Sequence, residues 1–526
     1  MRLPATLAAF TLAIAATVAP AQETKLPDIG SSANELLNPA KQAEYGGMML
    51  AQLRHYDYVL DDPLVDGWLQ SVGHRLAAAS DKPQQSFTFF MLKDRQFNAF
   101  ATLGGYVGAN AGMILAAENE DEVAGVLAHE VAHVTQTHVL RAAERAQKDS
   151  VPILLAMLGA IAVAESAGGA SSDDASMAAL ATAQGLMVQR QIDYTRSNEA
   201  EADRIGIQTL VRAGYDPQAM VRMFEQMQSI SRVNQGGERE RTPSYLQTHP
   251  VTTTRISEAR ARAETLAAKP PAIDAGGVPG GNPLLPPGLR VSGGAAGSDD
   301  VQFGWARERI RVLSANTAAE AVREYERMRK AKPLTDPQRY GLALAHERNG
   351  GHAAAKKELA PLLADHPADP WIVIAMAESE AHGGDLAGAD RRLEALLARM
   401  PRHRAASLSY ARLLVERNDA DAGRRAQNVL RPLLLTAKDD PIFQQTFARA
   451  SEAAGDPVRA GEAYAEAEVL NGRPERALVQ LNTLLKRPEV DYYARARIEA
   501  RIAEITPSVL ELRRQGVRDD ELERRI

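Results

Sequence analysis

The chain has 526 residues, of which 45% are hydrophobic, and a formal net charge of −6 at pH 7. So small a charge over this length predicts no nucleic-acid partner, because proteins that bind nucleic acids usually have strongly basic surfaces. The length predicts two or three domains. The absence of cysteine excludes disulfides and thiolate metal sites.

The N-terminus has the composition of a secretory signal peptide. A basic start precedes an apolar run from Leu7 to Val18, and Ala19-Pro20-Ala21 matches an A-x-A cleavage pattern. An uncleaved anchor helix is the weaker alternative, because the run is too short to span a bilayer. The sequence therefore predicts a signal peptide over 1–21 and a secreted chain that starts near Gln22, in the periplasm if the source is a Gram-negative bacterium.

Two helices and a small sheet are expected next. The helices lie between Leu36 and Ala79 and are joined near Asp61-Asp62-Pro63. Ser86 to Leu92 and Ala99 to Ala109 have the composition of strands, with Gly104-Gly105 as a turn. An exposed edge of this sheet could pair with the main chain of a peptide by β-addition. The alternative is an ordinary small sheet without that role.

The segment His129-Glu130-Val131-Ala132-His133 matches the pattern H-E-x-x-H within a continuous helical stretch. Histidines four residues apart project from one helix face, so both imidazoles can reach one zinc ion. Glu130 then lies where a carboxylate can take a proton from water. The alternative is a helix that carries these residues by chance. The motif predicts His129 and His133 as zinc ligands and Glu130 as a general base.

The most apolar internal run covers residues 151–164, and it is too short to span a membrane. We interpret it as a buried helix hairpin that links two metal-binding helices. The alternative is a mobile flap over the cleft, which would make a peripheral contact with a membrane.

A second helical segment, from Arg196 to Gly206, supplies further acids. Glu199 and Asp203 are four residues apart and share a helix face. Glu199 is predicted to be the third zinc ligand. Asp203 is predicted to support the site, because ligating histidines usually donate their second ring N–H to a carboxylate. The alternative is a solvated charged face with Arg204 as the counter-ion.

Two stretches, Glu118 to His138 and S-N-E-A-E-A-D-R-I-G from Ser197 to Gly206, resemble the zinc-metallopeptidase superfamily of the CAAX prenyl proteases and the heat-shock protease HtpX. The resemblance covers roughly residues 36–262 and is greatest to the periplasmic branch with a tetratricopeptide tail. It implies a zincin-like α+β fold. It also implies that His129, His133 and Glu199 are zinc ligands and that Glu130 is the general base. Asp203 would be a second acid, which is sometimes assigned as a proton donor.

Thr248-His249-Pro250 also resembles the family pattern at this place, and Pro250 keeps His249 off a helix. His249 is a candidate for a fourth metal ligand that displaces water and silences the enzyme, or for a residue that contacts the substrate oxyanion. A loop-structuring histidine is the alternative. His55, His74 and His138 lack partners at ligand spacing, and we interpret them as surface or packing residues.

Residues 269–300 are a linker dense in proline and glycine that cannot build a core. Beyond it the sequence repeats, because Asp336-Pro337 and Gly350-Gly351 recur as Asp369-Pro370 and Gly383-Gly384. The offset of 33 to 34 residues matches the tetratricopeptide period and predicts stacked helix pairs. A generic helical bundle is the alternative.

The sequence thus predicts a mainly α protein, with a zincin-like α+β metallopeptidase domain over 22–268 and an α-solenoid over 301–526. The predicted function is that of a secreted metalloendopeptidase with one Zn²⁺ per subunit. The resemblance implies that it degrades misfolded or stalled outer-membrane proteins and docks on their assembly machinery through the solenoid. The alternatives are a chaperone or scaffold with a largely latent protease site, and a zinc hydrolase of non-peptide substrates.

Overall fold

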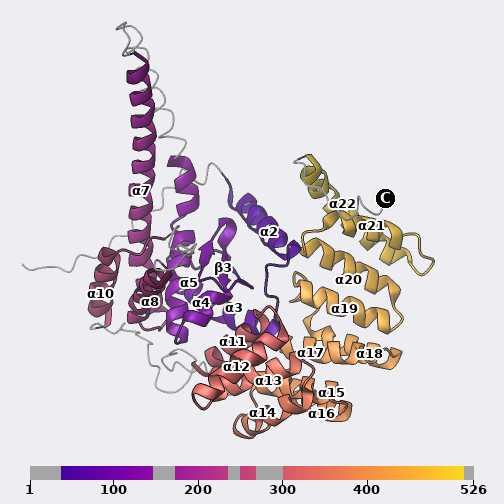
Figure 1. Ribbon diagram of the computed structural model, residues 1–526. Coiled ribbons are helices and arrows are strands. Elements are labelled where there is room, and N and C mark those ends of the chain that lie inside the picture. Colours follow the sequence, from indigo (N-terminus) through magenta and orange to yellow (C-terminus); the bar gives the residue numbers. More distant parts are fainter. Residues whose placement is uncertain (1–36, 146–171, 235–248, 268–299, 515–526) are drawn as a thin grey trace, which may run out of the picture.

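The computed structural model describes residues 37–145, 172–234, 249–267 and 300–514. Within these ranges the protein is mainly helical with one small sheet, which confirms the predicted fold class. Figure 1 shows an N-terminal part, up to Ala267, and a solenoid of helices that curves along one side of it. The predicted signal peptide, the hairpin or flap at 151–164 and the linker up to residue 299 lie outside the described residues.

The first two helices are α2 (Pro39–His55) and α3 (Pro63–Ala78). The side chains of Asn38 and Asp62 cap them by accepting hydrogen bonds from backbone N–H groups of the first turn. Both helices start with proline, which fits the first helical position because no N–H is needed there. The predicted pair of helices with its junction near Asp61-Asp62-Pro63 is therefore confirmed.

The sheet has three strands in the order β1-β3-β2, namely β1 (Thr88–Leu92), β3 (Tyr106–Asn110) and β2 (Ala99–Ala101). β3 runs parallel to β1 and antiparallel to β2. The turn between β2 and β3 contains the 3-10 segment Leu103–Gly105, and φ is positive at Gly104 (72°) and Gly105 (82°). Only glycine adopts this conformation readily, so the predicted turn is confirmed.

One edge of this sheet is covered. Leu60 N donates to Met91 O at 2.8 Å and Lys93 N donates to Tyr58 O at 2.9 Å, so the chain before α3 lies along β1. Among the described strands, β2 therefore forms the other edge, and it packs against α5 (Glu120–Thr135). The β-addition of a peptide stays a prediction, and β2 is the edge to which it applies.

Helix α5 is the centre of the N-terminal part. It follows the short α4 (Ala111–Ala116) and packs against α3, α7 (Ser172–Arg212) and α8 (Gln218–Asn234), while α10 (Thr253–Ala267) packs on α7 and α8. Nearly every residue of α5 is buried, including Glu120, Glu122 and Glu130. No helix of the described residues is long and apolar enough to cross a membrane.

The solenoid consists of consecutive helices joined by short turns. Gly350, Gly384 and Asn418 occupy equivalent turn positions one repeat apart and all have positive φ. The helices are α11 (Asp300–Leu313), α12 (Ala318–Ala331), α13 (Asp336–Arg348), α14 (His352–Asp365), α15 (Pro370–His382), α16 (Leu386–Arg399), α17 (Arg404–Val415), α18 (Ala420–Leu430), α19 (Pro441–Ala453), α20 (Pro457–Leu470), α21 (Pro474–Leu484) and α22 (Tyr492–Arg514).

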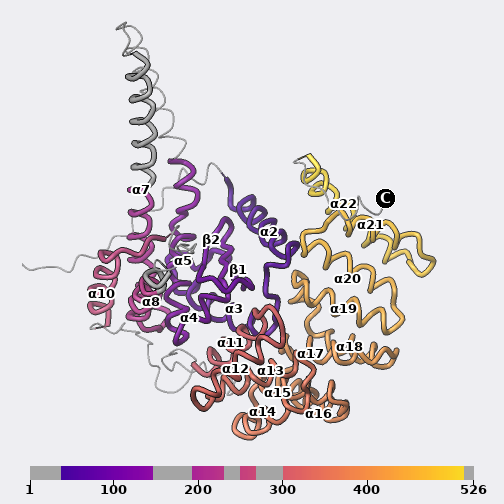
Figure 2. Tube along the Cα trace, viewed as in Figure 1, coloured from indigo at the N-terminus to yellow at the C-terminus, as the bar shows by residue number. Residues whose placement is uncertain are grey.

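The solenoid packs directly on the N-terminal part. Buried apolar side chains of the two parts form one continuous cluster, in which the rings of Trp68 and Phe303 lie 6.1 Å apart. In Figure 2, α11 lies beneath α3 at one end of the solenoid. Toward the other end, α20 and α21 lie on the side of α2. At that far end, Arg473 Nε donates to His55 Nδ1 at 3.3 Å. The two parts are therefore held together by tertiary contacts. The predicted boundary itself lies almost entirely outside the described residues and stays a prediction.

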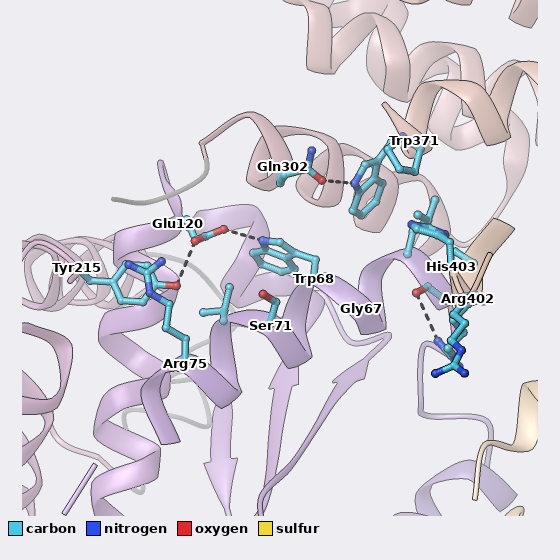
Figure 3. A pocket seen from close by; sticks show the side chains of 16 residues that line it. Gly67, Trp68, Ser71, Arg75, Glu120, Tyr215, Gln302, Trp371, Arg402 and His403 are labelled. Atoms are coloured by element: carbon cyan, nitrogen blue, oxygen red, sulfur yellow. Dashed lines mark hydrogen bonds between the residues drawn. The ribbon is translucent and has the colours of Figure 1, made fainter. Parts of the chain in front are cut away.

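A cavity of about 670 Å³ lies between α3 and the solenoid (Figure 3). At one end, Trp68 Nε1 and the Tyr215 hydroxyl donate to the Glu120 carboxylate at 2.9 and 3.2 Å. On the solenoid side, Trp371 Nε1 donates to the side chain of Gln302. Both parts supply its walls, so their relative position determines its shape.

Candidate metal centre

Helix α5 carries the H-E-x-x-H residues into the interior. Asn119 caps its first turn by accepting from Glu122 N at 3.1 Å. Two turns later His129 and Glu130 are fully buried, and His133 is nearly so. The Nε2 atoms of His129 and His133 lie 3.0 Å apart, as expected for imidazoles four residues apart on one helix face.

Helix α7 brings the two predicted acids to these histidines. Glu199 Oε1 lies 3.3 Å from His133 Nε2, and its Oε2 lies 3.4 Å from His129 Nε2. Asp203 Oδ1 lies 2.9 Å from His129 Nδ1, on the other side of the ring. Gly206 permits this approach, because a Cβ there would stand 3.2 Å from the His129 backbone. The structure thus brings all five of these predicted residues together.

His249 lies at the same centre, just before α10. Its Nδ1 is 2.8 Å from Glu199 Oε1 and 3.4 Å from His129 Nε2. Ligand atoms of His129, His133, Glu199 and His249 all lie within 4.8 Å of one another. His249 thus faces the same point as the three predicted ligands.

The geometry of these residues fits a metal ion. A tetrahedral zinc site with bonds of about 2.0–2.2 Å places neighbouring ligand atoms roughly 3.3–3.5 Å apart. The separations among His129, His133 and Glu199 are 3.0, 3.3 and 3.4 Å. Both carboxylate oxygens of Glu130 are buried without a hydrogen-bond partner in the described residues. The ring of His249 is near it, with Nε2 3.8 Å from Oε1, which is too far for a hydrogen bond. A buried carboxylate without hydrogen bonds is costly, and a bound ion or water would relieve that cost.

Arg255, in α10, is a charged residue of the centre to which the sequence analysis gave no role. Its guanidinium pairs with both oxygens of Asp203, at 2.7 and 2.8 Å, and with Glu199 Oε2 at 2.9 Å. It is buried and its charge lies 5.0 Å from the ring centre of Phe224. Arg255, and not the exposed Arg204, is therefore the counter-ion of these acids.

The interpretation of His138 as a surface or packing residue is wrong, because His138 contacts the metal centre. It is buried, and its Nδ1 lies 2.8 Å from Nδ1 of His133. Its Nε2 lies 3.2 Å from Glu201 Oε2, which also accepts from Arg141 at 3.0 Å. If His133 ligates through Nε2, its Nδ1–H donates to His138, and the Nε2–H of His138 donates to Glu201.

A backbone turn places His138 there. Helix α5 ends at Thr135, and Thr137 has a φ of 54°, which is strained for a β-branched residue. The chain then resumes a helix at 138–145, with His138 turned back toward His133. The five-residue spacing from His133 does not match a continuous helix face, so the helical pattern gave no signal for this pair.

The charges of the centre follow from burial and contacts. Burial would lower the pKa of His129, but Asp203 and Glu199 outweigh it and raise the pKa to about 10. For His133, burial prevails over the hydrogen bond to Glu199 and lowers the pKa to about 4. Burial would raise the pKa of Glu199, yet its contacts with the histidines hold that pKa far below its usual range. Glu199 is thus ionised at neutral pH, as a metal ligand must be.

Comparison with known proteins agrees with this site. The profile of peptidase family M48 matches residues 63–263. The beta-barrel assembly-enhancing protease of Escherichia coli (strain K12) is 30% identical over 500 residues, which are 95% of this chain and 95% of that protein. The protein of the same name from Yersinia pestis is 29% identical over 486 residues, 92% of each chain. A Vibrio cholerae relative is 39% identical over 256 residues, 48% of this chain and 51% of that protein. The chain therefore belongs to peptidase family M48, a family of metallopeptidases, and within it to the beta-barrel assembly-enhancing proteases.

Proposed function

We propose that this chain is a zinc-dependent endopeptidase whose metal ligands are His129, His133 and Glu199. The observation that carries the proposal is the convergence of these donors, with Glu130 next to His129 in the helix and 3.8 Å from His249. Glu130 is a fully buried carboxylate with no hydrogen-bond partner in the described residues. Two imidazoles and a carboxylate are a donor set of catalytic zinc sites that keep a fourth position for water. A bound zinc ion supplies Lewis acidity, which acidifies water and polarises a peptide carbonyl.

Glu130 is the residue that moves the proton. Its carboxylate accepts a proton from water as the water oxygen attacks the peptide carbonyl carbon, and it then delivers that proton to the leaving amine. Asp203 is a positioning residue in this proposal, because its Oδ1 lies 2.9 Å from Nδ1 of His129 and favours a proton on that nitrogen. Nε2 is then left to face the point shared with His133 and Glu199. Arg255 already engages both Asp203 oxygens, which argues against Asp203 as the proton donor.

The test is digestion of an unfolded protein such as casein, with zinc content measured on the same samples. Glu130→Gln should keep zinc and thermal stability and lose roughly 10²–10⁴-fold in rate, because only the base is removed. Glu258→Gln, at an exposed glutamate of α10, is the control and should digest at the wild-type rate. His133→Gln should lower zinc content. A Glu130→Gln variant with full activity, or a wild type without zinc after repletion, would refute the proposal.

His249 is proposed as a reversible fourth ligand that closes the site. The support is its Nδ1, which lies 2.8 Å from Glu199 and points to the same centre as the other donors. A fourth protein ligand excludes the water that the reaction needs. His249→Ala should then raise proteolysis, including self-cleavage, with little change in zinc. A loss of about 10²–10³-fold would instead assign His249 to the oxyanion, and no change would leave a loop-structuring role.

The substrate class rests on the relatives. Proteins named beta-barrel assembly-enhancing proteases match this chain over 92–95% of its length. On that basis, this chain acts in the periplasm on misfolded or stalled outer-membrane proteins, with the solenoid docking on their assembly machinery. Mass spectrometry of the protein from a periplasmic fraction should find Gln22 as its N-terminus. A cytoplasmic protein that retains Met1 would contradict the location.

A chaperone or scaffold with a largely latent protease site is the second candidate. The position of His249 favours it, because a site with four protein ligands is silent until one leaves. The two candidates differ in what Glu130→Gln does in cells. A protease requires the glutamate for every effect on outer-membrane assembly, whereas a chaperone keeps its effect when proteolysis is abolished.

A further inference from the structure

A second cluster of ligand-type side chains lies on the solenoid, where α13, α14 and α15 meet (Figure 1). Glu347 is in the last turn of α13, His352 is the first residue of α14, and His382 is the last residue of α15. Glu347 Oε1 lies 2.9 Å from His352 Nδ1 and 2.7 Å from His382 Nδ1. Ligand atoms of the three residues lie within 4.8 Å of one another.

The repeat architecture explains why these side chains meet. Turns with positive φ at Gly350 and Gly384 end α13 and α15 and leave the ends of successive helix pairs stacked on each other. His382 and Glu416 occupy equivalent positions one repeat apart. Glu416 Oε2 accordingly lies 3.3 Å from Nε2 of His382. Side chains from three successive helix pairs are therefore in contact at this edge of the solenoid.

We propose that Glu347, His352 and His382 form a second metal site, for a first-row divalent transition ion such as Zn²⁺ or Ni²⁺. Two imidazole nitrogens and one carboxylate oxygen suit such an ion, whereas Mg²⁺ and Ca²⁺ prefer oxygen donors alone. Both imidazoles present Nδ1 to the same carboxylate oxygen, so an ion bound between them would replace the hydrogen-bonding protons.

Two observations favour an ion over a simple hydrogen-bonded cluster. Glu347 is only 12% exposed, and its second oxygen, Oε2, is buried without a hydrogen-bond partner in the described residues. Glu416 Oε2 lies 3.3 Å from Nε2 of His382 and can hold the proton there, so Nδ1 is the nitrogen that would ligate once the ion replaces its proton. A carboxylate that holds the far side of a ligating imidazole is the usual outer partner in metal sites.

The site has room for further ligands. It borders a hollow of about 610 Å³ whose walls include Leu313, Leu344 and Glu378. Three protein donors leave at least one coordination position for water. An ion held here would tie the α13–α14 turn to the end of α15, and so stiffen the solenoid next to its contact with the N-terminal part.

The test measures bound metal on the full-length protein. Protein stripped with EDTA is dialysed against ZnCl₂, or separately NiCl₂, and its metal is counted by mass spectrometry. The wild type should bind one ion more than either His352→Gln or His382→Gln. His74→Gln removes an exposed histidine of α3 and is the control that should bind as the wild type does. Glu416→Gln should keep the site but weaken it by roughly 10–100-fold.

Comparison with His133→Gln separates this site from the proposed catalytic centre. In that variant the solenoid ion should remain and the ion of the centre should be lost. Hydrogen exchange should slow at residues 349–351 and 383–385 when Zn²⁺ is added, because the ion joins these turns. The proposal is overturned if His352→Gln and His382→Gln bind as much metal as the wild type, which would leave a hydrogen-bonded cluster only.

Discussion

Replacement of Asp62 by asparagine should weaken the contact between the N-terminal part and the solenoid. Asp62 is buried and accepts two hydrogen bonds from the guanidinium of Arg309, at 2.8 and 2.7 Å. The same carboxylate caps α3 by accepting from Leu64 N and Val65 N. Asparagine retains an oxygen for the cap but removes the negative charge. Arg309 is then a buried cation without its anion.

The size of the effect follows from that orphaned charge. Removing one partner of a buried ion pair costs about 3–5 kcal/mol in free energy of unfolding, whereas loss of a helix cap costs about 1 kcal/mol. Asp385→Asn is the matched control, because Asp385 caps α16 through Gly388 N and forms no ion pair among the described residues. That control should change the free energy of unfolding by a few tenths of a kcal/mol.

The assay is guanidinium unfolding followed by tryptophan fluorescence. The chain has three tryptophans, and all of them, Trp68, Trp305 and Trp371, are buried at or beside this contact. Their emission therefore reports on the contact directly. In Asp62→Asn the fluorescence change should occur at lower denaturant than in the wild type and in Asp385→Asn. Adding Arg309→Met should recover most of the loss, because the unpaired cation is removed.

The pH dependence has a definite sign. Burial alone would raise the pKa of Asp62, but Arg309 and the backbone N–H groups lower it below the unfolded value. A depressed carboxyl pKa stabilises the folded state at neutral pH, and the contribution is lost as the pH falls through the folded pKa. The difference between wild type and Asp62→Asn should thus be constant near pH 7 and shrink below about pH 4. An Asp62→Asn midpoint equal to that of Asp385→Asn at pH 7 would refute the reasoning.

Two further predictions concern the metal centre and the connection between the two parts. His138→Ala should lower zinc affinity by roughly 10–100-fold in chelator competition, because His133 loses its acceptor. His138→Gln should restore part of that affinity. Equal chelator resistance in the wild type and both variants would contradict the role of His138. A nonspecific protease should cut first within 269–300, because exposed Pro- and Gly-rich backbone is readily cleaved. The two fragments should still elute together in gel filtration. Separate elution would show that the contacts of Trp68 and Arg309 do not hold the two parts together.

The sequence alone was sufficient where the information is local. The spacing of His129 and His133 determines their common helix face, and the cap residues Asn119 and Asp62 mark where helices begin. The recurrence of helix starts and glycine turns every 33 to 34 residues was enough to predict the solenoid. These features depend on the 3.6-residue period, on capping and on residues that tolerate positive φ, all of which act within a few residues of chain.

Tertiary structure decided which distant side chains meet. Arg255 reaches Asp203 across 52 positions of sequence, and Asp62 pairs with Arg309 across 247. His138 faces His133 only because the backbone turns at Thr137. Helical spacing therefore gave a wrong prediction for the contacts of His138. A buried charge must find a partner, but periodicity does not say which one, because the choice depends on how whole helices pack. That packing places the solenoid against α3 and closes the centre around Glu130.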